Sequence, residues 1–168
     1  MKNVKKASME ETPAKNRNNL EDDFLQIVEN SNLPLFHSRS ASKELERIPG
    51  LSQYILTNAP YKSIYGITSS KNEYVIVDGE KHIRIRSSFQ TSSGSADEKY
   101  PFMLLNAIYA YPEQEVILLI DGGGYTPNAR KWLKDRIDEN WLGYRNTGKT
   151  IHLMDLSEFS AWFKQHFR

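Results

Sequence analysis

Residues 116–124, Val-Ile-Leu-Leu-Ile-Asp-Gly-Gly-Gly, decide the fold of this chain. Five consecutive apolar residues are typical of a strand that is covered on both faces, and the glycine run ends it. Apolar residues at helical spacing follow from Ala129 to Ile137, and Thr150–Met154 predicts another strand. A strand, a helix and a second strand in this order predict parallel strands that are joined by a right-handed crossover.

The segment before this stretch predicts antiparallel strands. Residues 73–77 and 82–87 have strand character, and Asp78-Gly79 between them suits a tight turn. Residues 61–67 predict one more strand ahead of them. Side chains alternate along the strand at 82–87, so that Arg84, Arg86 and Ser88 share one face.

Helices are predicted on both sides of these strands. Asn19 can cap a first helix, whose opening turn is acidic and which ends by Pro34. Further helices are predicted at 42–47, at 96–111 and after a cap at Asp155 or Ser157. The expected fold class is α/β, with a mixed central sheet flanked by helices on both faces.

Composition limits the classes of function that remain. The chain has 168 residues, 22 basic and 21 acidic side chains and no cysteine, so its formal net charge is +1. We expect a disordered basic tail at residues 1–18 and one domain at 19–168. The missing cysteines exclude disulfides and thiolate zinc sites and favour an intracellular (cytoplasmic) protein. No apolar run approaches membrane-spanning length, so no membrane partner is expected. A basic face would have to be local, because net charge alone does not favour polyanions.

Several segments together resemble a known family of nucleases. They are Glu73–Ile76, Ile85–Gln90, Gly94–Pro101, Val116–Gly124 and Ala129–Leu133. In this combination they resemble the PD-(D/E)XK, or restriction-endonuclease-like, superfamily over nearly the whole globular part. The resemblance implies a restriction-endonuclease-like fold.

The resemblance also implies where a catalytic site would lie. In this family an acidic residue on one strand and a Glu on the next hold Mg²⁺, and a Lys two residues later orients the attacking water. Glu73 falls at the first acidic position, Arg86 replaces the Glu and Ser88 replaces the Lys. Gln90 matches a Gln that often follows, and Glu21 matches an acidic residue that some members contribute from the first helix.

An arginine at the position of a metal ligand argues against a metal. At about 4 Å from Mg²⁺ and an effective dielectric of 20, the repulsion is roughly 8 kcal/mol. Binding of Mg²⁺ with a millimolar dissociation constant supplies a free energy of only about 4 kcal/mol. We therefore expect no cofactor, at most weak metal binding at Glu73, and an Arg86 that contacts a phosphate or pairs with Glu73 or Glu21.

The expected function is that of a nucleic-acid-associated protein with a degenerate nuclease site. It would be a DNA-binding or structural subunit of a restriction, defence or DNA-processing system, as a homodimer or beside an active nuclease subunit. Expected nucleic-acid contacts are Arg84, Arg86, Lys99, Arg130, Lys131 and Lys134, although the last three also fit a solvated helix.

Two alternatives remain open. The first is an active Mg²⁺-dependent DNA endonuclease with carboxylates that have migrated to neighbouring elements, for which the candidates are Asp78, Glu80, Asp97, Glu98 and Asp121. The second is a protein-interaction module without a nucleic-acid role.

Overall fold

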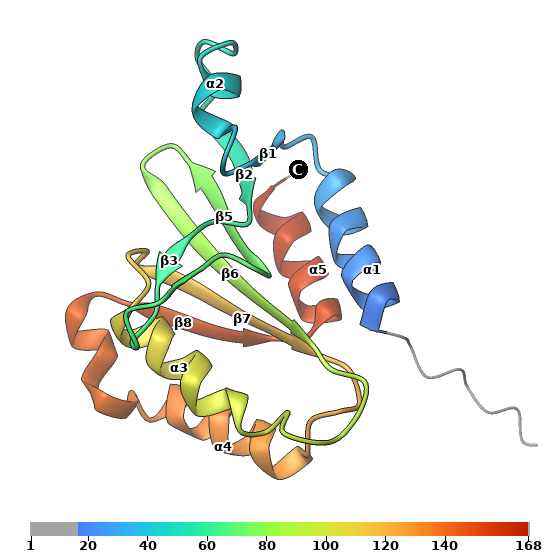
Figure 1. The fold of residues 1–168 in the computed structure, drawn as a ribbon, viewed down its shortest axis with the longest axis vertical. Helices are drawn as coiled ribbons and strands as arrows, with labels where there is room; N and C mark the ends of the chain where they lie inside the picture. Colours follow the sequence, from blue (N-terminus) through green and yellow to red (C-terminus); the bar gives the residue numbers. More distant parts are fainter. Residues whose placement is uncertain (1–16, 168) are drawn as a thin grey trace, which may run out of the picture.

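The centre of the molecule is a mixed six-stranded sheet in the order β1-β2-β5-β6-β7-β8 (Figure 1). The structure, a computed structural model, describes residues 17–167, so most of the expected tail at 1–18 lies outside the described residues. The strands of this sheet are β1 (Leu35–His37), β2 (Gln53–Thr57), β5 (Glu73–Asp78), β6 (Lys81–Phe89), β7 (Glu115–Asp121) and β8 (Thr150–Met154).

The strand directions divide the sheet into two parts. β1 and β2 are parallel to each other, and β2, β5 and β6 are antiparallel neighbours. β6, β7 and β8 are parallel, joined by crossovers through α3 (Lys99–Tyr109) and α4 (Pro127–Asp138). All five apolar residues at 116–120 are fully buried in β7. The predicted parallel portion is therefore confirmed, and it is centred on the expected strand.

Helices cover both faces of the sheet (Figure 1). On one face α1 (Arg17–Glu29) and α5 (Leu156–His166) bury a core with Ile117 and Leu119 of β7. On the other face α3 and α4 pack over Val116, Leu118 and Ile120. Two short helices complete the fold, namely α2 (Ala41–Leu45) and the 3-10 helix η1 (Trp141–Thr147). The predicted α/β class with a mixed, two-sided sheet is confirmed.

The strand predicted at 61–67 is wrong. Residues there form β3 (Tyr61–Lys62), which pairs with β4 (Thr68–Ser69) in a separate two-stranded hairpin. Gly66 has a φ of +75° and its amide donates to the Ser63 carbonyl at 2.8 Å, so the chain turns where a continuous strand was expected. The strand that pairs with β5 on this side is β2, and its buried and exposed side chains do not alternate regularly.

Two helix starts also differ from the prediction. α1 begins at Arg17, before the expected cap at Asn19. α3 begins at Lys99, after a turn in which the amides of Lys99 and Tyr100 donate to the carbonyls three residues before them. The Asp97 side chain in this turn accepts hydrogen bonds from the amide and hydroxyl of Thr126. Of the two candidate caps for α5, Asp155 and Ser157, Asp155 is the one observed, in a reciprocal capping box with Glu158.

The loop after β7 packs tightly on the end of β6. Gly122 has a φ of +102°, and a Cβ there would stand 2.2 Å from the Gln90 carbonyl oxygen. Asp121 accepts from the Gly122 amide through Oδ1 and from the Leu156 amide at the start of α5 through Oδ2. This loop therefore ties β6, β7 and α5 together at one edge of the sheet.

We expect Gly122→Ala to destabilise the protein by roughly 2–4 kcal/mol, because it combines an unfavourable backbone conformation with a steric clash. Urea unfolding of both proteins measures the difference. Gly123→Ala is the matched control, since no atom lies within 4 Å of a Cβ there and its φ is not positive. It should stay within about 1 kcal/mol of the wild type. Equal stabilities of the two variants would contradict the packing described for this loop.

Candidate functional site

The pairing of β5 with β6 places Glu73 directly opposite Arg86. Glu73 is the first residue of β5, and its side chain is fully buried. Arg84 and Arg86 share its face of the sheet because successive side chains of β6 alternate. The shared face of Arg84, Arg86 and Ser88 that the alternation predicted is also the face covered by α3.

Three donors surround the Glu73 carboxylate. Nη1 of Arg84 lies 3.2 Å from Oε2, and Nη1 of Arg86 lies 3.2 Å from Oε1. The hydroxyl of Tyr111 donates to Oε1 at 2.9 Å. The sequence-based pairing of Arg86 with Glu73, rather than with Glu21, is therefore the one observed.

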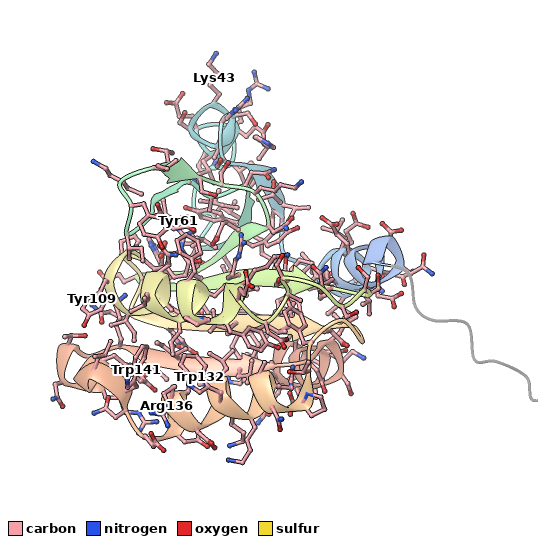
Figure 2. All side chains as sticks on the ribbon, turned by 60° about the horizontal axis from the view of Figure 1, so that its bottom comes forward. Lys43, Tyr61, Tyr109, Trp132, Arg136 and Trp141 are labelled. Atoms are coloured by element: carbon pink, nitrogen blue, oxygen red, sulfur yellow. The ribbon has the colours of Figure 1, made fainter. Side chains whose placement is uncertain are left out.

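Arg84 is the most enclosed member of this group. Its Nε and Nη2 bind both oxygens of Glu113 at 2.6 and 2.9 Å, and its Nη1 also donates to the Ala59 carbonyl at 3.1 Å. The guanidinium carbon packs over the rings of Tyr111 and Tyr61, at 4.8 and 5.6 Å from their centroids. Figure 2 shows Tyr61 between the strands and α3. We call Glu73, Arg84, Arg86, Tyr111 and Glu113 the ion network.

Arg84 was expected to contact nucleic acid, and the structure contradicts this. Its side chain is 2% exposed, and each of its nitrogens has a partner within the protein. A phosphate group would have to displace a buried carboxylate to reach it. Arg84 is a structural residue of the network.

Burial shifts the pKa of titratable groups in and beside the ion network. It raises the pKa of Glu73, and the guanidinium groups of Arg86 and Arg84 oppose that rise. Burial also raises the pKa of the Tyr111 hydroxyl well above its usual value, so this hydroxyl stays a proton donor. It lowers the pKa of Lys149, whose ammonium donates to the carbonyls of Tyr111 and Glu113.

The residues at this position do not fit a magnesium ion. Mg²⁺ requires oxygen ligands in octahedral geometry, whereas both oxygens of Glu73 already accept from cationic or hydroxyl donors. Within residues 17–167, no three or more His, Cys, Asp or Glu side chains gather in a way that could hold a metal. The single carboxylate opposite Arg86 is a partner for a cation on the protein itself.

Ser88 and Gln90 continue the polar face of β6 beyond Arg86. The Ser88 hydroxyl shares a hydrogen bond with the Tyr125 hydroxyl. The Gln90 amide oxygen accepts from Nζ of Lys99 at 3.1 Å. Ser88 therefore lies on the Arg86 face of β6, whereas Gln90 lies one residue past the end of the strand and is joined by Lys99 from the start of α3.

Glu21 does not belong to this group. It lies on α1, which covers the opposite face of the sheet, and burial together with the charge of Glu21 raises the pKa of Tyr74 to about 12. The structure therefore does not bring Glu21 together with Glu73, and its role in the site stays a prediction. The sequence shows where a residue lies along a helix, but it does not show which face of the sheet that helix covers.

The cations of α4 have acidic neighbours. Lys131 pairs with Asp135 and Lys134 pairs with Asp138, each one turn further along the helix. Arg130 donates to the Ile120 carbonyl at 3.0 Å, and one of its nitrogens lies 3.9 Å from Glu158. This arrangement favours a solvated helix face, and the nucleic-acid role of these three residues stays a prediction.

The carboxylates proposed for a migrated metal site are dispersed. Asp78 accepts from the side chain of Gln53, Asp97 holds Thr126, and Asp121 links β7 to α5. These three therefore have local structural partners, and no group of three or more acids that could hold a metal forms within residues 17–167.

Sequence reasoning missed Tyr111 and Glu113. Glu113 lies 29 positions after Arg84, in the loop between α3 and β7, so no periodicity connects the two. The available signal was Arg84 itself, because an arginine in a buried strand requires a carboxylate partner somewhere in the fold.

Comparison with protein families agrees with this architecture. A sequence model described as a PD-(D/E)XK nuclease superfamily domain matches residues 13–167. The chain therefore belongs to the PD-(D/E)XK nuclease superfamily. No curated protein and no solved structure matches it. Within the described residues, no helix has the length and apolar character needed to cross a bilayer.

We expect Arg84→Gln to destabilise the protein by about 3–5 kcal/mol, because it leaves two carboxylates buried without their cation. Urea unfolding at neutral pH measures this loss. Lys131→Gln is the control, since it breaks an exposed ion pair and should cost less than about 1 kcal/mol. If Arg84→Gln were as stable as this control, Glu73 and Glu113 would not depend on Arg84.

Proposed function

We propose that this protein is a nucleic-acid-associated member of the superfamily whose metal-dependent cleavage site has been replaced by a salt-bridged structural network. In this role it would serve as a DNA-binding or structural subunit of a restriction, defence or DNA-processing system. The observation that carries the proposal is the enclosure of Glu73 by Arg84, Arg86 and Tyr111.

Energetics support the loss of metal-dependent cleavage. A cation at Glu73 would have to displace two guanidinium groups that lie 3.2 Å from its oxygens. Removing one partner of a buried ion pair costs about 3–5 kcal/mol, which is comparable to the whole free energy of millimolar metal binding. The serine at position 88 also removes the ammonium that the family uses to orient water.

Two observations support the retained contact with nucleic acid. The chain belongs to a nuclease superfamily, and the polar face of β6 still carries positive charge at its surface. Arg86 is 22% exposed, and Lys99 is exposed and bound to a neutral amide instead of a carboxylate. These are the residues through which we propose that phosphate groups are held.

An exposed apolar surface supports a subunit role. Tyr65 and Ile67 of the β3–β4 hairpin are 72% and 66% exposed, and Tyr109 of α3 is 64% exposed. Tyr65 stacks on Phe102 of α3 with 5.3 Å between ring centroids, so the hairpin and the helix form one surface. Exposed apolar groups that gather in this way are typical of protein-interaction sites.

The metal hypothesis is tested by calorimetry and by cleavage assays. We expect no saturable heat when Mn²⁺ or Mg²⁺ is titrated in the low millimolar range, because the oxygens of Glu73 are occupied by protein donors. We also expect no cleavage of plasmid or single-stranded DNA above the level of Glu73→Ala. Cleavage by the wild type that Glu73→Ala abolishes would instead establish an active endonuclease.

Nucleic-acid association is tested by a gel shift at several salt concentrations. Phosphate contacts predict that the logarithm of the binding constant falls linearly with the logarithm of the salt concentration. Absence of a shift at low salt would contradict the proposal and favour a protein-interaction module instead.

A further inference from the structure

Arg86 uses only one side of its guanidinium group within the protein. Both of its hydrogen bonds come from Nη1, which donates to the Lys71 carbonyl at 2.7 Å and to Glu73 at 3.2 Å. Its Nε and Nη2 have no hydrogen-bond partner within residues 17–167, and neither is among the buried polar atoms that lack one. The edge formed by Nε and Nη2 is therefore directed to solvent-accessible space.

This half-bound state differs from that of Arg84 on the same strand face. Arg84 donates to Glu113 through Nε and Nη2, which is the same edge that Arg86 leaves open. Arg84 thus shows within this protein how that edge binds a planar oxyanion with two parallel hydrogen bonds. A phosphate group offers the same pair of acceptor oxygens.

We propose that the Nε and Nη2 edge of Arg86 binds a phosphodiester group of nucleic acid, beside the carboxylate that would hold a metal in an active relative. This inference rests on the proposed function and names the ligand class of the site. Glu73 and the Lys71 carbonyl fix the guanidinium before the ligand arrives, which reduces the conformational entropy lost on binding. At this position the guanidinium of Arg86, and not a metal ion, would then bind the phosphate.

The neighbouring side chains extend this site along β6. Ser88 lies two residues further on the same face, roughly 7 Å from Arg86, and the Gln90–Lys99 pair follows just past the end of the strand. Ser88 and Lys99 bring hydroxyl and ammonium donors, and their recorded partners are the uncharged Tyr125 and Gln90.

The charges of the group favour an anion. The two carboxylates of the ion network balance the two guanidinium groups, so the network itself is neutral. Lys99 adds positive charge further along, at Gln90. An incoming phosphate would meet a guanidinium that is fixed by Glu73 and the Lys71 carbonyl, while the carboxylates of the network already accept hydrogen bonds from its own cations.

The test measures binding of a short fluorescein-labelled single-stranded oligodeoxynucleotide to the full chain by fluorescence anisotropy, over a series of salt concentrations. Arg86→Gln should weaken binding about tenfold or more, because a bidentate charge-assisted contact is lost. It should also reduce the salt slope by about 0.7, the value of one phosphate contact on a single strand. Arg86→Lys keeps the charge but lacks the two parallel N–H donors, so it should bind several-fold more weakly than the wild type.

Arg136→Gln is the matched control. Arg136 is a partly exposed arginine, at 31% against 22% for Arg86, and it pairs with Glu139 just past the end of α4. Figure 2 shows it well apart from Tyr61, which packs against Arg84. The substitution removes the same charge away from the proposed site and should leave the affinity within about twofold of the wild type. Circular dichroism checks that each variant is folded.

Each outcome decides between the two proposals. Equal binding by Arg86→Gln and Arg136→Gln would overturn the Arg86 site and leave nucleic-acid binding through other residues intact. Absence of binding by the folded wild type would overturn both proposals. If Arg86→Gln did not fold, Arg86→Lys would decide, and an affinity equal to that of the wild type would overturn the inference.

Discussion

The buried guanidinium of Arg84 is the interaction on which this region of the fold depends. It joins β6 to Glu73 of β5, to Glu113 in the loop before β7, and to the Ala59 carbonyl ahead of the hairpin. A buried charge is tolerated only when it is paired and fully hydrogen-bonded, and Arg84 meets both conditions. Four segments that are distant in the sequence are therefore fixed relative to one another by one side chain.

The same arrangement shows how cations of the chain itself can stabilise Glu73 in the scaffold of a nuclease superfamily. In the superfamily, carboxylates on adjacent strands repel one another unless a cation lies between them, so the metal also stabilises the local structure. Here the cations are Arg84 and Arg86, which are part of the chain. The sheet, the crossovers and the covering helices are retained around this substitution.

Local pattern was sufficient to predict the elements whose burial is regular. The apolar run at 116–120 and the turn at Asp78-Gly79 lie where their residue types predict. Of the alternatives that the sequence left open, Asp155 is the cap of α5 and Glu73 is the carboxylate that pairs with Arg86. Prediction failed where the outcome depends on distant parts of the chain. The apolar residues of 61–67 are divided by a glycine turn, and the partner of Arg84 is supplied by a loop that only the complete fold brings near.

The shared use of Glu73 by two arginines has a consequence for how the sequence can change. Replacing Glu73 alone leaves two cations without their common partner, and replacing Arg84 alone leaves two acids without theirs. An acid introduced at position 86 would face Glu73 across the strand pair and repel it. A carboxylate-lined metal site at this position would thus need several coordinated substitutions, with unstable intermediates between them. The network therefore limits which substitutions the chain can accept one at a time.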